Sequence, residues 1–258
     1  MPRLNTLLAT IEDGAARGEP VAVVRALDVA SGKKSTATVS RGELSPPIAD
    51  RSITERVLAA VDNLMQRGGI ADLVEVTDEQ ESRVKLAIEI VRPKFELIVF
   101  GGGHVGQAVA LIGALIGYDV TVIDDREEFA SRNRLPDPRI RLLVSDYDRA
   151  TDKLNITAST AVVIVTRGHQ YDEVCLKKVI GSKATYIGMI GSRRRVTSVF
   201  KKLAGEGVSE QDLQRVHAPI GLRIGAVSPQ EIGVSILAEI IAHLNKPGHE
   251  YKGERNAI

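Results

Sequence analysis

The 258-residue sequence contains a single cysteine, Cys175, and no tryptophan. One cysteine excludes an internal disulfide framework and a zinc site built on a CxxC pair, and it is typical of a reducing compartment. The sequence also lacks an excess of charge, since 34 Lys and Arg face 33 Asp and Glu. We therefore expect no broad attraction to nucleic acid or to an anionic membrane, so any anion site must be local.

Long apolar runs are also missing. No stretch approaches the roughly 18 apolar residues that span a membrane, and no charged start with an apolar run marks a targeting segment, so we expect a cytoplasmic protein. The five histidines show no HExxH spacing, and we therefore expect no tightly held metal ion. Apolar residues make up 43% and charged residues 26% of the chain, which is typical of globular proteins.

Hydrophobic patterning divides the chain near Arg92. Before it, two helices and alternating strands predict a smaller N-terminal α+β domain over residues 1–92. After it, short apolar strands alternate with helices, which is typical of βαβ units. We expect an α/β protein whose second domain, residues 93–258, is a Rossmann-like doubly wound parallel sheet. Its predicted strands cover residues 97–100, 120–123, 140–144, 161–165 and 185–190.

The glycine-rich segment GGGHVG, residues 101–106, follows the first of these strands and opens an apolar helix. In this context the spacing predicts a phosphate-binding turn of a dinucleotide site. The first glycine permits the tight turn, the third lets a pyrophosphate approach the backbone, and the last lets the helix pack against the sheet. The alternative is a glycine-rich turn without a ligand. The predicted cofactor-binding residues here are Gly101, Gly103, His104, Val105 and Gly106.

Two acidic residues, Asp124 and Asp125, end the next strand. A carboxylate at this position accepts hydrogen bonds from ribose hydroxyls and repels a 2′-phosphate, which favours an NAD-like ligand over NADP. Arg126 beside them weakens that inference. Asp125 has the alternative role of capping a following helix.

Three arginines crowd the predicted start of another helix, after Gly191 and the expected N-cap Ser192. Cations there oppose the helix dipole by about 0.3–1 kcal/mol each, so an anion is expected to compensate them. A phosphate is one interpretation, since Arg suits bidentate contact. Arginines in solvent or paired with a nearby acid are the other. The binding residues predicted on this rim are Arg167, Gly191, Ser192, Arg193 and Arg194.

Three further residues are candidates for catalysis. His169 with Asp172 is a candidate acid/base or metal-binding pair. His217 lies in another predicted rim loop, where a structural role is equally expected. Cys175 lies among apolar helix residues, which favours a buried small hydrophobe over a reactive thiol.

Taken together, these motifs resemble the xanthine dehydrogenase accessory family, XdhC/CoxI. The resemblance covers residues 95–244, and the segments that carry it are 101–106, 124–130, 166–172, 186–194 and 217–232.

The resemblance implies a maturation factor for molybdenum hydroxylases. Such a protein binds the molybdenum cofactor, molybdopterin or its dinucleotide, and delivers it in sulfurated form to a xanthine- or carbon-monoxide-dehydrogenase-like client, with a cysteine desulfurase as a further partner. Many members carry a glycine-rich segment with a cysteine in the N-terminal domain, where this chain has RGELSPP, residues 41–47. That departure argues against thiol coordination of molybdenum there.

Two other functions fit the same residues. An NAD-dependent oxidoreductase would use the same glycine turn, because binding a nucleotide does not establish hydride transfer. A nucleotide-sensing regulatory domain would need a partner surface instead of a reactive pocket. The sequence leaves open whether the protein is an enzyme. The apolar last helix leads us to expect a homodimer.

Overall fold

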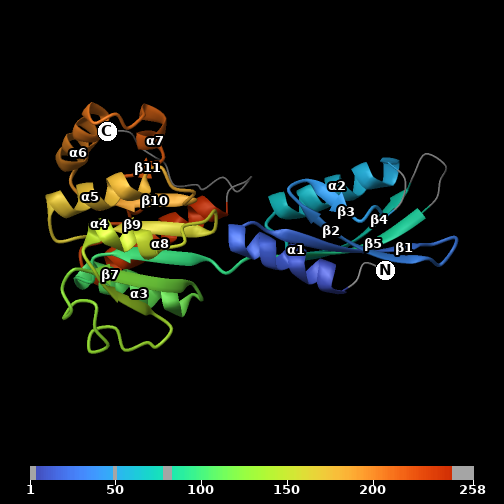
Figure 1. Cartoon of the computed structure of the whole chain (residues 1–258), viewed down its shortest axis with the longest axis horizontal. Coiled ribbons are helices and arrows are strands. Elements are labelled where there is room, and N and C mark those ends of the chain that lie inside the picture. The colour runs from blue at the N-terminus through green and yellow to red at the C-terminus, as the bar shows by residue number, and fades with distance from the viewer. Residues whose placement is uncertain (1–3, 49–50, 78–82, 246–258) are drawn as a thin grey trace. The chain divides into compact units, whose positions relative to one another are not determined.

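The computed structural model describes residues 4–48, 51–77 and 83–245. The chain forms two compact units, and Figure 1 shows the elements of each. The first runs to Pro93 and the second from Lys94 to Leu244. The α/β class, with a smaller N-terminal α+β part and a Rossmann-like part, is confirmed.

The first unit is an antiparallel sheet with a helix on each face. Its strands are β1 (Val21–Asp28), β2 (Lys34–Ser40), β3 (Glu43–Ser45), β4 (Ala71–Thr77) and β5 (Arg83–Val91), in the order β3-β2-β1-β5-β4. The helix α2 (Arg51–Gln66) covers the face whose alternate residues are buried, such as Val24 and Ile88. The helix α1 (Leu4–Arg17) meets the opposite face, where Gly14 approaches Val21 (Figure 1).

The second unit is a six-stranded parallel sheet in the order β11-β10-β9-β6-β7-β8. Its strands are β6 (Glu96–Phe100), β7 (Asp119–Asp124), β8 (Arg141–Val144), β9 (Thr160–Ile164), β10 (Tyr186–Met189) and β11 (Val216–His217). The chain builds outward from β6 to β8, then returns to the other side of β6 at β9. The carboxyl ends of β6 and β9 therefore form the switch point at which doubly wound sheets bind ligands.

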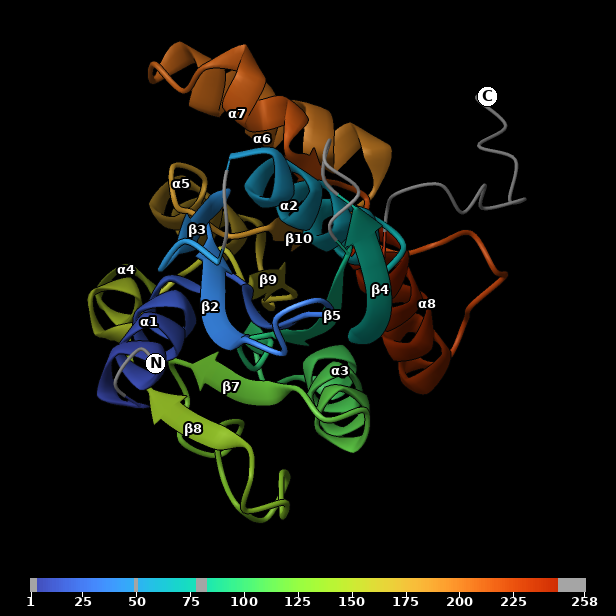
Figure 2. The same cartoon turned by 90° about the vertical axis from the view of Figure 1, so that its right-hand side faces the viewer.

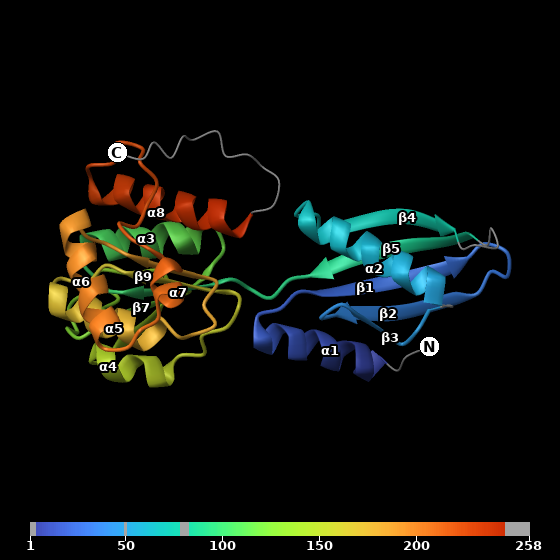
Figure 3. The same ribbon diagram turned by 90° about the horizontal axis from the view of Figure 1, so that it is seen from above.

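Helices cover both faces of this sheet. On one face lie α3 (His104–Leu115) and α8 (Pro229–Leu244), which run side by side in Figures 2 and 3. On the other lie α4 (Tyr147–Ala150), α5 (His169–Val179) and α6 (Arg193–Gly205), while α7 (Glu210–Gln214) leads into β11. Each face has its own apolar core, which explains why the strands are apolar on both sides.

The last helix has a different role from the one expected. Its apolar residues Ile236, Leu237 and Ile240 are buried inside the same unit, and Gly233 lies against Ala108 of α3. Much of the apolar face from which we expected a homodimer thus packs within the same unit, so this helix does not support a dimer, which stays a prediction.

Candidate functional site

The glycine turn after β6 has the geometry of a tight, closely packed loop. Gly101 has a φ of +107°, and a Cβ there would lie 2.5 Å from the carbonyl oxygen of Val165. A Cβ on Gly106 would lie 1.8 Å from the carbonyl oxygen of Gly101. These two positions therefore require glycine for the turn itself and for the contact between α3 and the sheet.

Gly103 differs, because a Cβ there would meet no atom within 4 Å. Gly103 is the N-cap of α3, and no side chain caps this helix end. The first backbone N–H groups of a helix have no partner within the helix, so an uncapped end with open space before it suits an anion. His104 is exposed beside this space, and Val105 is half-buried.

Asp124 holds the turn in place. Its Oδ2 accepts a hydrogen bond of 2.8 Å from the Gly102 amide, and its Oδ1 accepts from both the backbone and Nε of Arg126. Burial opposes ionisation of this carboxyl, but the hydrogen bonds from Arg126 and Gly102 outweigh burial and lower its pKa. Asp124 is fully buried, so both its oxygens act on the protein's own loop.

An aromatic ring between two guanidinium groups borders the turn, and sequence reasoning missed it. The Cζ atoms of Arg126 and Arg134 lie 3.5 Å and 4.4 Å from the Phe129 ring centroid. The backbone of Phe129 also packs against the turn, because a Cβ on Gly102 would lie 2.3 Å from its carbonyl oxygen. The segment after β7 thereby supports the turn from outside.

Asp125 and Arg167 form an ion pair at the rim. Arg167 Nη2 donates to Asp125 Oδ2 at 2.8 Å and to the Tyr171 hydroxyl at 2.9 Å. The guanidinium also lies over the Tyr171 ring. The structure thus brings together two predicted binding residues that are 42 positions apart in sequence.

Asp172 is not the exposed acid that an acid/base pair with His169 would need. It is fully buried, accepts from the backbone amide and hydroxyl of Thr166, and pairs with Arg195. In this structure Asp172 therefore holds Thr166 and Arg195 in place, and a catalytic role for it stays a prediction. His169 begins α5, but its side chain lies outside the described residues.

The start of α6 partly follows the expectation. Ser192 is the N-cap and accepts from the Arg195 amide at 3.3 Å, after Gly191 with a φ of +157°. One of the three arginines, Arg195, has its anion in Asp172. Arg193 and Arg194 are both exposed on the first turn of α6.

His217 belongs to a polar cluster between β10, β11 and α8. Its Nδ1 lies 3.2 Å from Glu239 Oε1, which also accepts from the Tyr186 hydroxyl at 2.7 Å, and its ring stacks on Tyr186. Burial opposes the charge on Glu239, but the hydrogen bonds from His217 and Tyr186 outweigh burial and lower the pKa of its carboxyl. These contacts join α8 to the sheet.

Other chemistry is sparse in the part of the chain that the structure describes. There, no group of three or more His, Cys, Asp or Glu is arranged to hold a metal ion. Nor is any helix among residues 4–48, 51–77 and 83–245 long and apolar enough to cross a membrane. Cys175 is buried, and burial raises the pKa of its thiol, as expected for an unreactive cysteine.

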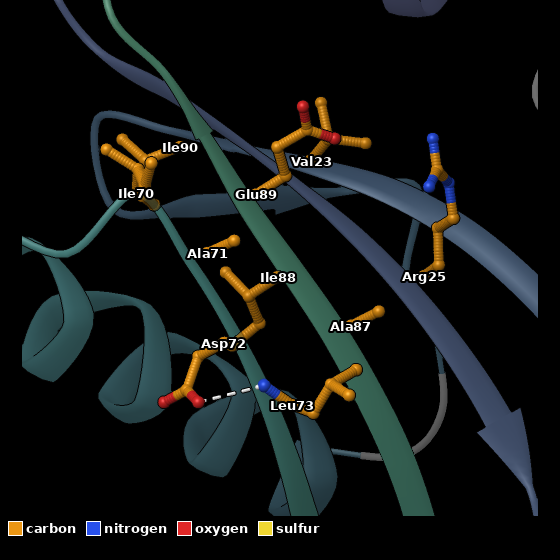
Figure 4. Close-up of a pocket in the computed structure, with 10 residues that line it drawn as sticks. All are labelled: Val23, Arg25, Ile70, Ala71, Asp72, Leu73, Ala87, Ile88, Glu89 and Ile90. Atoms are coloured by element: carbon orange, nitrogen blue, oxygen red, sulfur yellow. Dashed lines mark hydrogen bonds between the residues drawn. The ribbon is translucent and has the colours of Figure 1, made fainter.

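The first unit has a groove of its own on the sheet face opposite α2. It measures about 640 Å³ and is lined by β1, β4 and β5, with Arg25 and Glu89 projecting from neighbouring strands (Figure 4). Leu73 on its edge is 83% exposed. Sequence reasoning did not predict this groove.

The strand order and the glycine turn define the second unit as a Rossmann-like domain. More narrowly, the chain belongs to the XdhC family, because the family model described as "XdhC Rossmann domain" matches residues 97–240. The resemblance seen in the sequence is thereby confirmed.

Three curated relatives extend the comparison. The chain is 32% identical over 216 residues to the uncharacterized protein YqeB of Escherichia coli, covering 80% of this chain and 39% of the relative. It is 28% identical to a protein of Bacillus subtilis named as a probable xanthine dehydrogenase subunit, covering 62% and 46%. It is 26% identical to the molybdenum cofactor insertion chaperone PaoD of Escherichia coli, covering 58% and 40%. The chain thus spans less than half the length of these relatives.

A solved structure shares the fold. A crystal structure described as a xanthine dehydrogenase from Bacillus halodurans superposes with a TM-score of 0.64 at 19% identity, covering 96% of this chain and 73% of that one. At this identity the likeness concerns the fold of the chain alone.

Proposed function

We propose that this protein is a cytoplasmic accessory factor for a molybdenum hydroxylase. Its Rossmann unit binds the molybdenum cofactor as cargo, through the phosphate of molybdopterin or the pyrophosphate of its dinucleotide, and passes it to the client enzyme. Membership of the XdhC family and the similarity to a protein named as a molybdenum cofactor insertion chaperone support this proposal. A cysteine desulfurase that supplies sulfur to the cargo is a further proposed partner.

The observation that carries the proposal is the open space at Gly103. The neighbouring glycines are closed in by backbone, whereas Gly103 faces space in front of an uncapped helix end. A phosphate there would accept hydrogen bonds from the amides that start α3, and the exposed Arg194 on the same rim adds positive charge. The donors fit a phosphorylated ligand.

A glycine substitution tests this directly. Gly103→Ala places a methyl group in the open space, so we expect the variant to fold at a cost of about 1 kcal/mol or less. We expect it to bind the phosphorylated ligand about tenfold more weakly, because the methyl group occupies the ligand's position. Gly181→Ala is the matched control, since a Cβ on Gly181 would also meet no atom within 4 Å and its φ is not left-handed.

Thermal shift measurements with molybdopterin, its cytidine dinucleotide, NAD, NADP and FAD identify the ligand, because a ligand that binds only the folded state raises the melting temperature. A selective response to the pterin ligands that is smaller in Gly103→Ala supports the proposal. A selective response to NAD would favour a dehydrogenase instead. Undiminished binding by Gly103→Ala would remove the turn from the site.

A further inference from the structure

The ion pair between Asp125 and Arg167 lies across the end of the strand that leads into the glycine turn. Asp125 follows β7 and Arg167 follows the end of β9, and these two strands flank β6 in the sheet. The 2.8 Å contact between their side chains therefore bridges the carboxyl end of β6. This is the crevice in which a ligand of a doubly wound sheet lies.

Two buried oxygen atoms beside this bridge make no hydrogen bond within the described part of the chain. Asp125 Oδ1 is buried and makes no hydrogen bond within residues 4–48, 51–77 and 83–245, and Arg126 Nε is 3.8 Å away. The hydroxyl of Tyr147, a residue only 3% exposed, is also without a partner in the described part of the chain. The Tyr147 ring lies 5.5 Å, centroid to centroid, from the ring of Tyr171, whose hydroxyl accepts a hydrogen bond from Arg167.

Buried polar atoms without partners are rare in folded proteins and call for a specific explanation. Both oxygens of Asp124 are occupied by Gly102 and Arg126, so Asp124 has no free acceptor to offer. Asp125 has one oxygen on Arg167 and, among the described residues, one without a donor. The carboxylate left for a ligand at the end of β7 is therefore that of Asp125.

The geometry points to a ligand exchange at this bridge: a ribonucleoside diphosphate group displaces Asp125 from Arg167, so that its pyrophosphate pairs with Arg167 while a ribose hydroxyl donates to Asp125. This inference rests on the proposed function and narrows the cargo to a dinucleotide form, because a pterin with a single phosphate carries no ribose. NAD shares the same chemical group. Asp125 and Arg167 are thus the specificity-determining pair.

The charges make such an exchange feasible. The Arg167 side chain is 36% exposed, and ion pairs of this exposure are weak, so a pyrophosphate with two or more negative charges competes well against one carboxylate. When the Arg167 guanidinium moves away from Asp125, the carboxylate becomes available to a hydroxyl donor. A single movement thereby frees both the guanidinium that pairs with the pyrophosphate and the carboxylate that accepts from the ribose.

Titration calorimetry at fixed ionic strength tests the exchange on the full chain. The probes are inorganic pyrophosphate, the nucleotides ADP and CDP, and the 2′,3′-dideoxy analogues of these two nucleotides. For wild type, we expect the diphosphate with a ribose to bind about tenfold more tightly than its dideoxy analogue. Tighter binding of CDP assigns the source to a pterin–cytidine dinucleotide, and tighter binding of ADP assigns it to NAD.

The variants separate the two halves of the recognition. Arg167→Gln should weaken every probe about tenfold. Asp125→Ala should bind pyrophosphate about two- to fivefold more tightly, since the competing carboxylate is gone, and should lose the preference for ribose. Glu206→Ala is the control, because it removes one carboxylate from another exposed ion pair of the same unit. Its affinity for each probe should equal that of wild type.

The failures are distinguishable. If no probe and no dinucleotide binds the wild type, the proposed function is overturned together with the exchange. If the nucleotides bind equally well to wild type, Arg167→Gln and Asp125→Ala, only the exchange is overturned. Equal affinity of the ribose and dideoxy forms for wild type also overturns it.

Discussion

Among the ion pairs of the second unit, the one between Asp172 and Arg195 should contribute most to stability. We expect neutralisation of Asp172 to lower the free energy of unfolding of this unit more than neutralisation of any other paired carboxylate. The carboxylate of Asp172 is fully buried, and its partner Arg195 has a side chain only 18% exposed. Breaking a buried pair by removing one charge costs about 3–5 kcal/mol, because the other charge stays buried without compensation. Asp172→Asn keeps the shape and can still accept from Thr166. Because Arg195 retains some contact with water, we expect about 3 kcal/mol, which is a fall of roughly 6–12 °C in melting temperature.

Urea unfolding followed by circular dichroism measures this cost, with the transition of the first unit as an internal reference. A double-mutant cycle isolates its cause: Arg195→Met removes the unpaired charge, so the double variant should be more stable than Asp172→Asn alone. A loss of less than about 1 kcal/mol in Asp172→Asn would refute the reasoning. So would a double variant that is no more stable than the single one.

Two further predictions concern the glycine turn. Gly106→Ala should destabilise the second unit by about 3 kcal/mol or more in the same urea assay, since its Cβ meets backbone at 1.8 Å, and a cost equal to that of Gly103→Ala would contradict the packing argument. Asp124→Asn should lose stability at neutral pH. Because the folded pKa of Asp124 lies below its usual 3.8, this carboxylate stabilises the fold above that pH and its contribution vanishes as the pH falls through the folded pKa. The difference in free energy of unfolding between wild type and Asp124→Asn should therefore shrink as the pH falls. A difference that does not depend on pH would contradict the assignment of this stability to the ionised carboxylate.

Local patterns predicted the second unit well, because its elements begin and end with signals that act within a few residues. The last helix is an example. Ser228 and Glu231 form a capping box, in which the Glu231 carboxylate accepts from the Ser228 amide at 2.8 Å and the Glu231 amide donates to Ser228 Oγ at 3.3 Å. Such contacts depend only on spacing along the chain, so the sequence contains them in full. The two-residue strand β11 was missed, because so short a pairing has no periodicity of its own.

The ion pairs of the rim could not be predicted in this way. Asp172 and Arg195 are 23 positions apart, and Asp125 and Arg167 are 42 apart. Which acid meets which arginine depends on strand order and on the height at which each strand ends. The excess of positive charge at the start of α6 indicated the need for an anion, and a carboxylate from α5 provides it for Arg195.

This arrangement bears on how a carrier can release its cargo. A protein that binds a phosphate with free arginines gains the full interaction, and it then holds the ligand tightly. Here Arg167, which is proposed to bind the ligand, already has a partner within the protein in Asp125. The net free energy of binding is only the difference between the new contacts and the contacts they replace. When the ligand leaves, Asp125 pairs with Arg167 again, so neither charge of this pair is left without a counterion. Exchange of this kind therefore favours moderate affinity and reversible transfer, which a delivery protein needs and which an enzyme with a resident cofactor does not.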